Sequence, residues 1–289
     1  MDRKFLRAIP MNSNTQAQRI LITGAGSGLG RALALRYAAA GWRVAVTDRD
    51  LASAGQTLQQ VVAAGGSGFA DVCEVTSEDA FAAVAARLDR EWGGVDVLVN
   101  NAGVATKGTV AEAPLEQWQW VLNINLLGCV RGARAVIPLL KRQRSGHIVN
   151  IASFAGIANP PAMASYNVAK AGVISLSETL RHELEADGIG VSVACPTFFK
   201  TNLIATSRDA PGVGQDSAPQ MDKIVQRLME KSSFTAETVA GLIFDAVRER
   251  RFLVLASADD KRQVLIKRLS PELYYRMVQK ATAKFLQKR

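Results

Sequence analysis

The sequence predicts an α/β fold: a doubly wound parallel sheet of about seven strands with helices on both faces. Short apolar runs, such as residues 19–23 and 95–99, alternate along the chain with longer segments of helical composition. Apolar residues predominate in these runs without alternating with polar ones, which is typical of parallel strands buried on both faces. With 289 residues, 48% of them hydrophobic and 21% charged, the chain suits a single globular domain with a large core.

The first apolar run stops at a glycine-rich turn, and helical composition follows from residue 31 to residue 40. The turn reads Gly24-Ala-Gly-Ser-Gly-Leu-Gly30. Glycine permits a tight turn and lets backbone N–H groups approach a pyrophosphate at the positive end of the next helix. The order of strand, glycine turn and helix therefore favours a dinucleotide-binding site at the carboxyl end of this strand.

A carboxylate follows the second expected strand, residues 42–47. Asp48 stands 18 positions after Gly30 in the chain. A carboxylate at this distance can accept both ribose hydroxyls of an adenosine and would repel the 2′-phosphate of NADP, which favours NAD. The neighbouring Arg49 could instead hold that phosphate, so NADP stays an alternative.

The remaining elements continue the alternation of strand and helix. In chain order we expect a strand at 68–75, a helix at 80–92, strands at 95–99 and 147–152 separated by a long helix at 115–140, a helix at 164–186, and strands at 191–195 and 251–256. Residues 202–233 are expected to form a substrate lid, with a turn-rich part at 202–218 and a short helix at 220–231. A further helix is expected to start at Thr235.

Tyr166 and Lys170 stand one turn apart in the helix expected at 164–186. A free phenol has a pKa near ~10, and a cation within ~4–6 Å favours its ionised form. Lowering that pKa by ~3 units takes about 4 kcal/mol, much of which a partly buried ammonium could supply. The pair is therefore a candidate general acid/base, although Tyr-x-x-x-Lys alone also describes an ordinary solvated helix face.

Several motifs occur together in a characteristic order: Thr23-Gly24-x-x-x-Gly28-x-Gly30, Asn100-Asn101-Ala102-Gly103, Asn125, Ser153, Tyr166-x-x-x-Lys170 and Pro196. Over residues 19–256 the chain resembles the short-chain dehydrogenase/reductase family. The resemblance implies a single Rossmann-type domain and an NAD(P)-dependent oxidoreductase with four catalytic residues. Asn125 would hold a water for proton relay, Ser153 would hydrogen-bond the substrate oxygen, Tyr166 would be the acid/base, and Lys170 would bind the nicotinamide ribose.

The same resemblance assigns cofactor-binding residues. Together with Asp48 and Arg49 they are Gly24, Ser27, Gly28, Leu29 and Gly30 at the pyrophosphate, Glu74 and Val75 near adenine, Asn101, Ala102 and Gly103 along the cofactor, and Tyr166, Lys170, Pro196 and Thr201 at the nicotinamide. Two departures from the family pattern leave alternatives. The usual Asp-Val pair near adenine corresponds to Glu74-Val75, with Asp71-Val72 as an alternative register, and Pro196 is followed by Thr197 in place of the usual glycine.

Apolar side chains flank the expected catalytic residues, which favours a lipophilic secondary alcohol or ketone, steroid-like or acyl-derived, as substrate. The candidate substrate-binding residues are Phe154, Met163, Phe198 and Phe199. Alternatively, these side chains pack in the core. A second hypothesis for the whole protein is a catalytically idle NAD(P) sensor or scaffold, because a fold does not guarantee turnover.

The composition also bounds location and partners. We expect residues 1–18 to be a flexible leader, and no apolar run reaches the length of a membrane span. The three cysteines are widely spaced and no His/Cys cluster occurs, which predicts free thiols, no metal site and a cytoplasmic protein. The resemblance implies a homodimer or homotetramer formed through the helices that begin near Leu115 and Ala164.

Nearly the whole formal net charge of +9 lies in residues 261–289 of the C-terminal extension (257–289), which contain nine Lys or Arg and one acidic residue, Glu272. Leu273, Met277, Ala281 and Phe285 repeat every fourth residue beside a basic stripe, which predicts a basic amphipathic helix. Its apolar face could dock on its own domain or on a sister subunit, and we favour this interpretation over peripheral contact with an anionic membrane. Nucleic-acid binding is not expected, because no base-reading motif or aromatic interleaving accompanies the charge.

Overall fold

The computed structural model describes residues 17–197, 232 and 234–286, the last three by their backbone only. Most of the expected leader and substrate lid, the helix expected at 220–231, and the candidate site residues Phe198, Phe199 and Thr201 lie outside the described residues.

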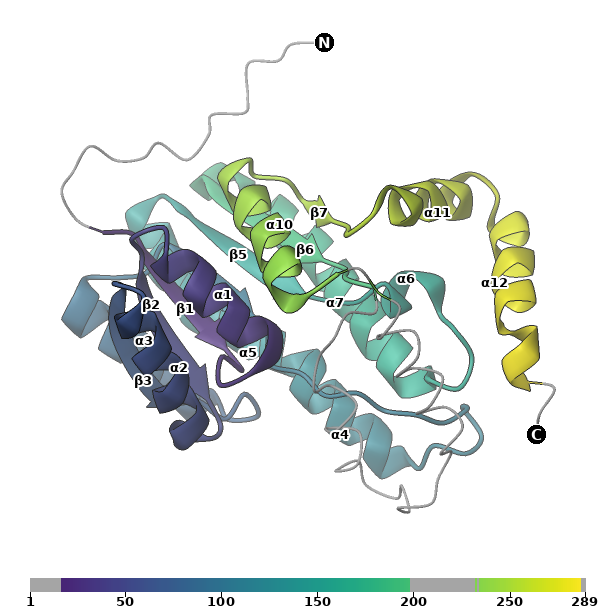
Figure 1. Cartoon of the computed structure of the whole chain (residues 1–289), viewed down its shortest axis with the longest axis horizontal. Helices are drawn as coiled ribbons and strands as arrows, with labels where there is room; N and C mark the ends of the chain where they lie inside the picture. The colour runs from purple at the N-terminus through teal and green to yellow at the C-terminus, as the bar shows by residue number, and fades with distance from the viewer. Residues whose placement is uncertain (1–16, 198–231, 233, 287–289) are drawn as a thin grey trace, which may run out of the picture.

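The described part of the chain contains one sheet of seven parallel strands in the order β3-β2-β1-β4-β5-β6-β7, which confirms the predicted doubly wound α/β fold (Figure 1). The strands are β1 Arg19–Thr23, β2 Arg43–Asp48, β3 Ser67–Val72, β4 Val97–Asn100, β5 Gly146–Ile151, β6 Ile189–Ala194 and β7 Leu253–Val254. The strand order reverses between β1 and β4. In folds of this class, the crevice at the carboxyl ends of such strands is where ligands bind.

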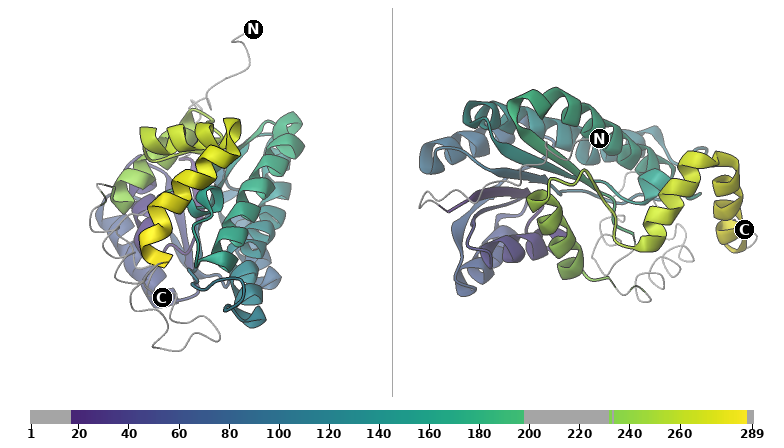
Figure 2. Two further views of the ribbon diagram at one scale, coloured as in Figure 1. Left: turned by 90° about the vertical axis from the view of Figure 1, so that its right-hand side faces the viewer. Right: turned by 90° about the horizontal axis from the view of Figure 1, so that it is seen from above.

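Helices cover both faces of the sheet. They are α1 Gly28–Ala38, α2 Leu51–Ala63, α3 Glu78–Trp92, α4 Leu115–Asn125, α5 Leu127–Gln143, α6 Ala155–Ala158, α7 Ala164–Leu184, α10 Ala236–Arg248, α11 Ala258–Leu269 and α12 Pro271–Leu286, with a 3-10 turn at Glu185–Asp187. Successive residues of β1 point to opposite faces, as the strand period requires. Ile20 and Ile22 pack with α1, α2 and α10, whereas Leu21 packs with α3, α5 and α7. The right-hand view of Figure 2 shows α1 and α10 on one side of the sheet and α5 and α7 on the other.

Three expected boundaries were wrong, and one helix was missed. The helix expected at 115–140 is two helices, α4 and α5, with a break at Leu126, and the strand expected at 68–75 already ends at Val72. Helix α1 begins at Gly28, inside the glycine turn, α2 was not expected, and the extension expected to be helical forms two helices, α11 and α12. The break at Leu126 has a tertiary cause, because the Asn125 side chain bonds the Val104 backbone, and apolar periodicity does not report such a contact.

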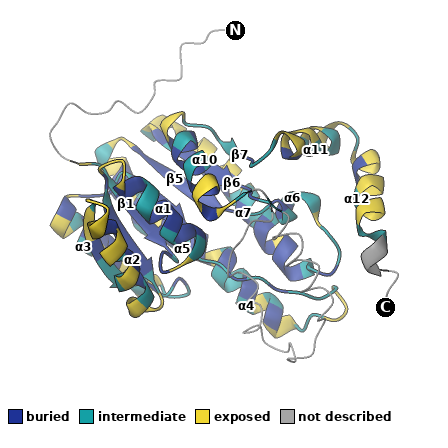
Figure 3. Ribbon diagram, in the orientation of Figure 1, coloured by how far each residue is buried: buried dark blue, intermediate teal, exposed yellow. Residues whose placement is uncertain are grey.

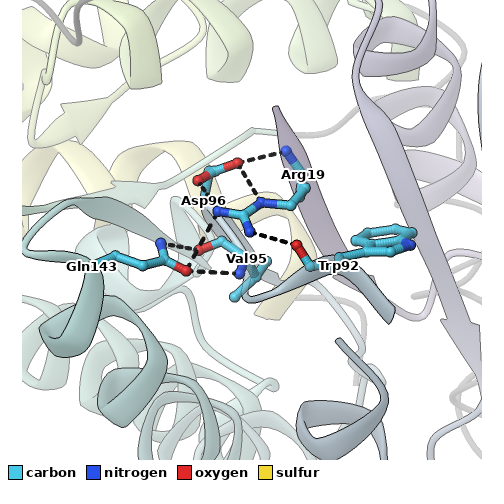
Figure 4. A network of polar contacts seen from close by, with 5 residues as sticks. All are labelled: Arg19, Trp92, Val95, Asp96 and Gln143. Atoms are coloured by element: carbon cyan, nitrogen blue, oxygen red, sulfur yellow. Dashed lines mark hydrogen bonds and ion pairs between the residues drawn. The ribbon is translucent and has the colours of Figure 1, made fainter. Parts of the chain in front are cut away.

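A polar network closes the amino ends of β1 and β4, the edge of the sheet opposite to the carboxyl ends (Figure 4). The Arg19 guanidinium makes a two-pronged contact with Asp96, at 2.7 and 2.9 Å, and also donates to the Trp92 carbonyl. Gln143, at the end of α5, bonds both the N–H and the C=O of Val95. The network ties β1, β4, α3 and α5 together at one point.

The C-terminal extension forms two helices, α11 and α12, that project from the end of the molecule and pack mainly on each other (Figure 1). A capping box between Ser257 and Asp260 starts α11. On α12 the buried side chain is Tyr274, whereas Leu273 and Met277 are 52% and 38% exposed (Figure 3). Leu273 and Met277 are therefore not covered by the chain's own domain, and docking on a sister subunit, the other form of the expectation, stays a prediction. No helix in the described part of the chain combines the length and the apolar character needed to cross a membrane.

Candidate active site

The structure brings the four predicted catalytic residues to the carboxyl edge of the sheet. Ser153 follows β5, Asn125 ends α4, and Tyr166 and Lys170 lie on α7. The Lys170 ammonium lies 5.8 Å from the centre of the Tyr166 ring, and Ser153 hydrogen-bonds the Tyr166 hydroxyl. Asn125 and Lys170 approach the same spot from two helices, because a Cβ added to Gly103 would lie 3.1 Å from Asn125 Oδ1 and 3.5 Å from Lys170 Nζ.

Burial dominates the electrostatics of the Tyr166 and Lys170 pair. It raises the pKa of Tyr166 to about 12, and the hydrogen bond from Ser153 only partly opposes that rise. It also lowers the pKa of Lys170, whose ammonium is held by a 2.8 Å hydrogen bond to the Ile151 carbonyl. Half-ionising Tyr166 near pH 7 would require about 7 kcal/mol of further stabilisation of the phenolate. The chain alone therefore keeps this phenol protonated near pH 7, and a further positive charge beside it would lower its pKa.

Asn125 fixes the loop that follows β4. Its side-chain N–H donates to the Val104 carbonyl and its Oδ1 accepts from the Val104 N–H, both at 2.8 Å. The Cys129 thiol donates to the backbone carbonyl of Asn125, which lies at the break between α4 and α5. Asn125 is fully buried, so these contacts end one helix and position the loop that carries Gly103. Its role in a proton relay stays a prediction.

The glycine turn after β1 has the shape of an anion cradle. Gly24 has φ +63°, and a Cβ there would lie 2.8 Å from the Ala102 Cα. A Cβ on Gly30 would lie 2.2 Å from the Gly24 carbonyl oxygen. Ser27 makes no side-chain cap and the first turn of α1, which includes Gly28 and Leu29, contains no acidic residue. These backbone N–H groups and the positive end of the helix dipole therefore fit a pyrophosphate.

Thr23 and Asn101 join the cradle to the end of β4. The Thr23 hydroxyl accepts the N–H groups of Asn101 and Ala102, at 3.0 and 3.1 Å. The Asn101 amide donates to the carbonyls of Thr23 and Gly24, at 2.9 and 3.1 Å. In the sequence Thr23 stands out only as part of a motif, whereas its place at the end of β1, beside the end of β4, lets it hold the loop that begins with Asn101.

Asp48 lies where the sequence placed it, at the end of β2 and beside the glycine turn. Its carboxylate accepts the Gly26 N–H at 2.9 Å and the Asp50 N–H at 3.1 Å. In the same stretch, hydrogen bonds from the Ser53 side chain and the Ala52 backbone, and to a smaller extent the charge of Arg49, lower the pKa of Asp50. A carboxylate beside the cradle favours uncharged hydroxyl groups over an anion as its partners there.

The two alternative registers near adenine differ in their partners. Asp71 forms a 3.0 Å ion pair with Arg87 of α3, so its carboxylate is engaged on the flank of the sheet. Val75 lies beyond β3, buried, and its carbonyl accepts a 3.2 Å hydrogen bond from Arg131. The geometry favours Glu74-Val75, which follows the strand at its carboxyl end.

The two candidate substrate residues that the structure describes, Phe154 and Met163, lie in different surroundings. Phe154 is buried in a cluster with Val173 and Cys195, which agrees with the core-packing alternative. Met163 is half-buried against the cluster that contains Tyr166. The backbone of Pro196 accepts the Phe154 N–H at 3.0 Å, so the end of β6 is tied to the segment after Ser153.

Sequence reasoning missed a buried polar cluster beside Tyr166, formed by Thr106, Gln117 and Ser165. No signal in the sequence singles it out, because glutamine on a helix is most often exposed. In the described residues, no group of three or more His, Cys, Asp or Glu side chains is placed to hold a metal ion, and Cys73, Cys129 and Cys195 are free and buried.

The fold and site define a doubly wound α/β protein with a Ser–Tyr–Lys cluster at the carboxyl edge of its sheet. The family model described as short chain dehydrogenase matches residues 18–212. The chain belongs to the short-chain dehydrogenase family.

Individual relatives agree with this family. The chain is 35% identical over 234 residues to a probable oxidoreductase, EphD, of Mycobacterium tuberculosis, a match that covers 80% of this chain but only 40% of that relative. It is 33% identical over 232 residues to the 3-oxoacyl-(acyl-carrier-protein) reductase FabG of Staphylococcus epidermidis, which covers 79% and 92% of the two chains. A short-chain dehydrogenase/reductase from Burkholderia phymatum, crystallised in complex with NAD, superposes with a TM-score of 0.82 at 33% identity, over 89% of this chain and 95% of that one.

Proposed function

We propose that this chain is an NAD(P)-dependent oxidoreductase that interconverts a secondary alcohol and the corresponding ketone. The observation that carries the proposal is the convergence of Ser153, Tyr166 and Lys170 next to a glycine cradle at a helix N-terminus. The names of the relatives, an oxidoreductase and a 3-oxoacyl reductase, support the same reaction class. An idle sensor would not require a complete acid/base set, so we favour the enzyme over that alternative.

In this proposal the chain supplies positioning and proton transfer. Ser153 and Tyr166 hydrogen-bond the oxygen of the substrate, and Tyr166 gives or takes its hydroxyl proton. The Lys170 ammonium favours the phenolate form of Tyr166 and hydrogen-bonds the ribose next to the nicotinamide. The nicotinamide cofactor supplies the site that accepts or donates the hydride.

For the cofactor we propose NAD, with NADP as the weaker alternative. The cradle of Gly24, Gly28 and Gly30 would hold the pyrophosphate, and Asn101 and Ala102 would line the path to the nicotinamide. Asp48 supports NAD, because its carboxylate beside the cradle would accept ribose hydroxyls and repel a 2′-phosphate.

Replacing Tyr166 by phenylalanine tests the reaction. We expect turnover of secondary alcohols to fall at least ~10³-fold, because the variant has no proton to exchange, while NAD affinity changes less than about threefold. The measurement is the absorbance of reduced cofactor with a panel of alcohols and ketones, with NAD and NADP side by side. Undiminished turnover in the variant would contradict the assignment.

We propose a lipophilic substrate, steroid-like or acyl-derived. Met163 supports this class, because it presents a half-buried apolar side chain in the cluster around Tyr166. Phe154 is buried, so its side chain does not support this substrate class. If small sugars or hydrophilic alcohols are turned over best in the panel, the lipophilic class is wrong.

We also propose a homodimer or homotetramer formed through α4 and α7 and the adjoining start of α5. Leu115, Leu127 and Val168 are 66%, 43% and 51% exposed on these helices, which is unusual for large apolar side chains unless a partner covers them. Light scattering of the purified protein measures the assembly. A monomer at micromolar concentration would exclude it.

Peripheral contact with an anionic membrane is proposed for the C-terminal extension. Beyond residue 260 the chain has nine Lys or Arg and one acidic residue, and Leu265, Leu269, Leu273 and Met277 are exposed beside these cations. Exposed leucines flanked by basic residues suit insertion among anionic headgroups. We expect co-sedimentation with phosphatidylglycerol vesicles at low salt, at least about fivefold weaker for Leu273→Glu. Leu51→Glu is the control, because Leu51 is equally exposed, at 52%, but lies on α2.

A further inference from the structure

A buried polar cluster connects three of the segments that form the active site. The Gln117 amide donates to the Lys107 carbonyl at 2.9 Å and to the Ser165 hydroxyl at 3.1 Å. The Ser165 hydroxyl in turn lies 2.8 Å from that of Thr106. The side chains of Thr106, Gln117 and Ser165 are at most 1% exposed, so water does not compete for these bonds.

Each member of the cluster belongs to a segment that carries a site residue. Ser165 precedes Tyr166 in the first turn of α7, and Gln117 lies on α4, the helix that ends at Asn125. Thr106 lies in the loop after β4, which begins with Asn101 and Gly103. The relative positions of the acid/base, the Asn125 end of α4 and the loop proposed to line the cofactor therefore depend on these few hydrogen bonds.

The entry into α7 needs such support, because its backbone is strained. Ala162 has φ +63°, a left-handed conformation that is unfavourable for any residue with a Cβ. The peptide of Gly108 holds this segment from the other side, since its N–H donates to the Ala162 carbonyl at 3.0 Å and its C=O accepts the Ala164 N–H at 3.1 Å. Two members of the cluster adjoin this bridge in sequence: Thr106 lies two residues before Gly108, and Ser165 directly follows Ala164.

Stabilising the fold does not by itself explain this cluster. Gln117 Oε1 is buried and has no hydrogen-bond partner among the described residues. A half-satisfied buried amide costs stability relative to an apolar side chain of the same shape. The hydrogen bonds of Gln117 instead align α7 with α4 and with the loop after β4.

We infer that Gln117, with Thr106 and Ser165, is a positioning residue that holds Tyr166 in hydrogen-bonding range of Ser153 and beside Lys170. This inference rests on the proposed role of Tyr166 as acid/base. Without the cluster the first turn of α7 shifts, Tyr166 loses part of the contact that favours its phenolate, and its proton becomes harder to remove.

The test compares Gln117→Met, Thr106→Val and Ser165→Ala with Thr106→Ser, which restores the hydroxyl. Gln119→Met is the matched control, because Gln119 lies on the same helix and is exposed. The Ser165→Ala variant should still fold, because alanine is the most favourable residue in a helix. The first readout is the pH titration of ¹³Cζ-labelled tyrosine in the NAD-saturated protein; the chain has four tyrosines, and Tyr166→Phe assigns the relevant signal.

We expect the pKa of Tyr166 to rise by about one unit in the three cluster variants, and to be unchanged in Thr106→Ser and Gln119→Met. The second readout is steady-state kinetics: kcat should fall about tenfold with less than a twofold change in KM for NAD. A wild-type titration in a folded Ser165→Ala or Thr106→Val protein would overturn the inference. Failure of the proposed reaction looks different, because Tyr166→Phe would then remain active while the titration still reports the position of the phenol.

Discussion

Gly30 illustrates how strongly one position constrains the candidate site. Its Cα faces the Gly24 carbonyl so closely that an added Cβ would lie 2.2 Å from that oxygen, and 2.6 Å from the Asn101 amide nitrogen. Backbone cannot give way as a flexible side chain can. The glycine therefore lets the cradle close against α1, and a methyl group there would push apart the segments that are proposed to hold the pyrophosphate.

We predict that Gly30→Ala destabilises the fold by about 1–3 kcal/mol and weakens NAD binding at least about tenfold. Gly55→Ala is the control, since Gly55 lies inside α2 and nothing lies within 4 Å of its added Cβ. That change should stabilise the protein by about 0.5–1 kcal/mol through helix propensity. Urea denaturation and NAD titration by fluorescence measure both. Equal behaviour of the two variants would contradict the steric argument.

At the scale of elements, the Arg19 network and the break between α4 and α5 lie at opposite ends of the strand pair β1 and β4. The network in Figure 4 closes the amino ends of β1 and β4, whereas Asn125 ends α4 near their carboxyl ends. One end of the strand pair is thus locked by a bidentate ion pair. The other end is shaped by loops that are held by hydrogen bonds of Thr23, Asn101 and Asn125.

We predict that Arg19→Lys costs about 1.5–3 kcal/mol of unfolding free energy, because lysine cannot make the two-pronged contact with Asp96. The two side chains are only 14% and 27% exposed, so solvent screens them weakly. Arg142→Lys tests the contrast: the side chains of Arg142 and Asp89 are 55% and 41% exposed, so solvent screens their pair and this substitution should lower the unfolding free energy much less than Arg19→Lys does. Similar losses in both variants, measured by urea denaturation, would contradict this account.

For the molecule as a whole, a buried histidine links stability to pH. His147 of β5 is fully buried, and burial, aided by Arg250, lowers its pKa to about 3. The Ser192 hydroxyl donates to the Arg251 carbonyl, so it accepts from His147 Nε2–H, at 2.8 Å, and the ring is neutral. Nδ1 has no partner among the described residues and faces Gly190, where a Cβ would lie 2.3 Å away.

The sign of the pH dependence follows from where the proton binds. Below pH ~6.5 the unfolded chain protonates this histidine while the folded chain does not until pH falls near 3, so its contribution to stability is complete above ~6.5 and is lost as pH falls between these values. We predict a loss of about 2 kcal/mol between pH 7 and pH 5 from this group. His147→Gln should remove that part of the pH dependence, and His182→Gln, at an exposed position, should not. Urea denaturation at pH 7 and at pH 5 measures this loss in each variant.

Much of the molecule follows from local sequence. Apolar runs of strand length, separated by helical composition, are sufficient for the doubly wound sheet, and the glycine turn and the one-turn spacing of Tyr166 and Lys170 are properties of contiguous residues. Such features depend on backbone conformation and on the period of one element, which the residues themselves set.

Only the tertiary structure decided which polar groups meet across distant segments. The ion pair of Asp71 with Arg87 favours Glu74-Val75 as the register near adenine, and the contact of Asn125 with Val104 divides a helix that apolar periodicity draws as one. The exposure of Leu273 and the burial of Gln117 likewise contradict what helix patterns suggest. A buried polar side chain is stable only where a partner from elsewhere in the chain satisfies it, and no local pattern carries that information.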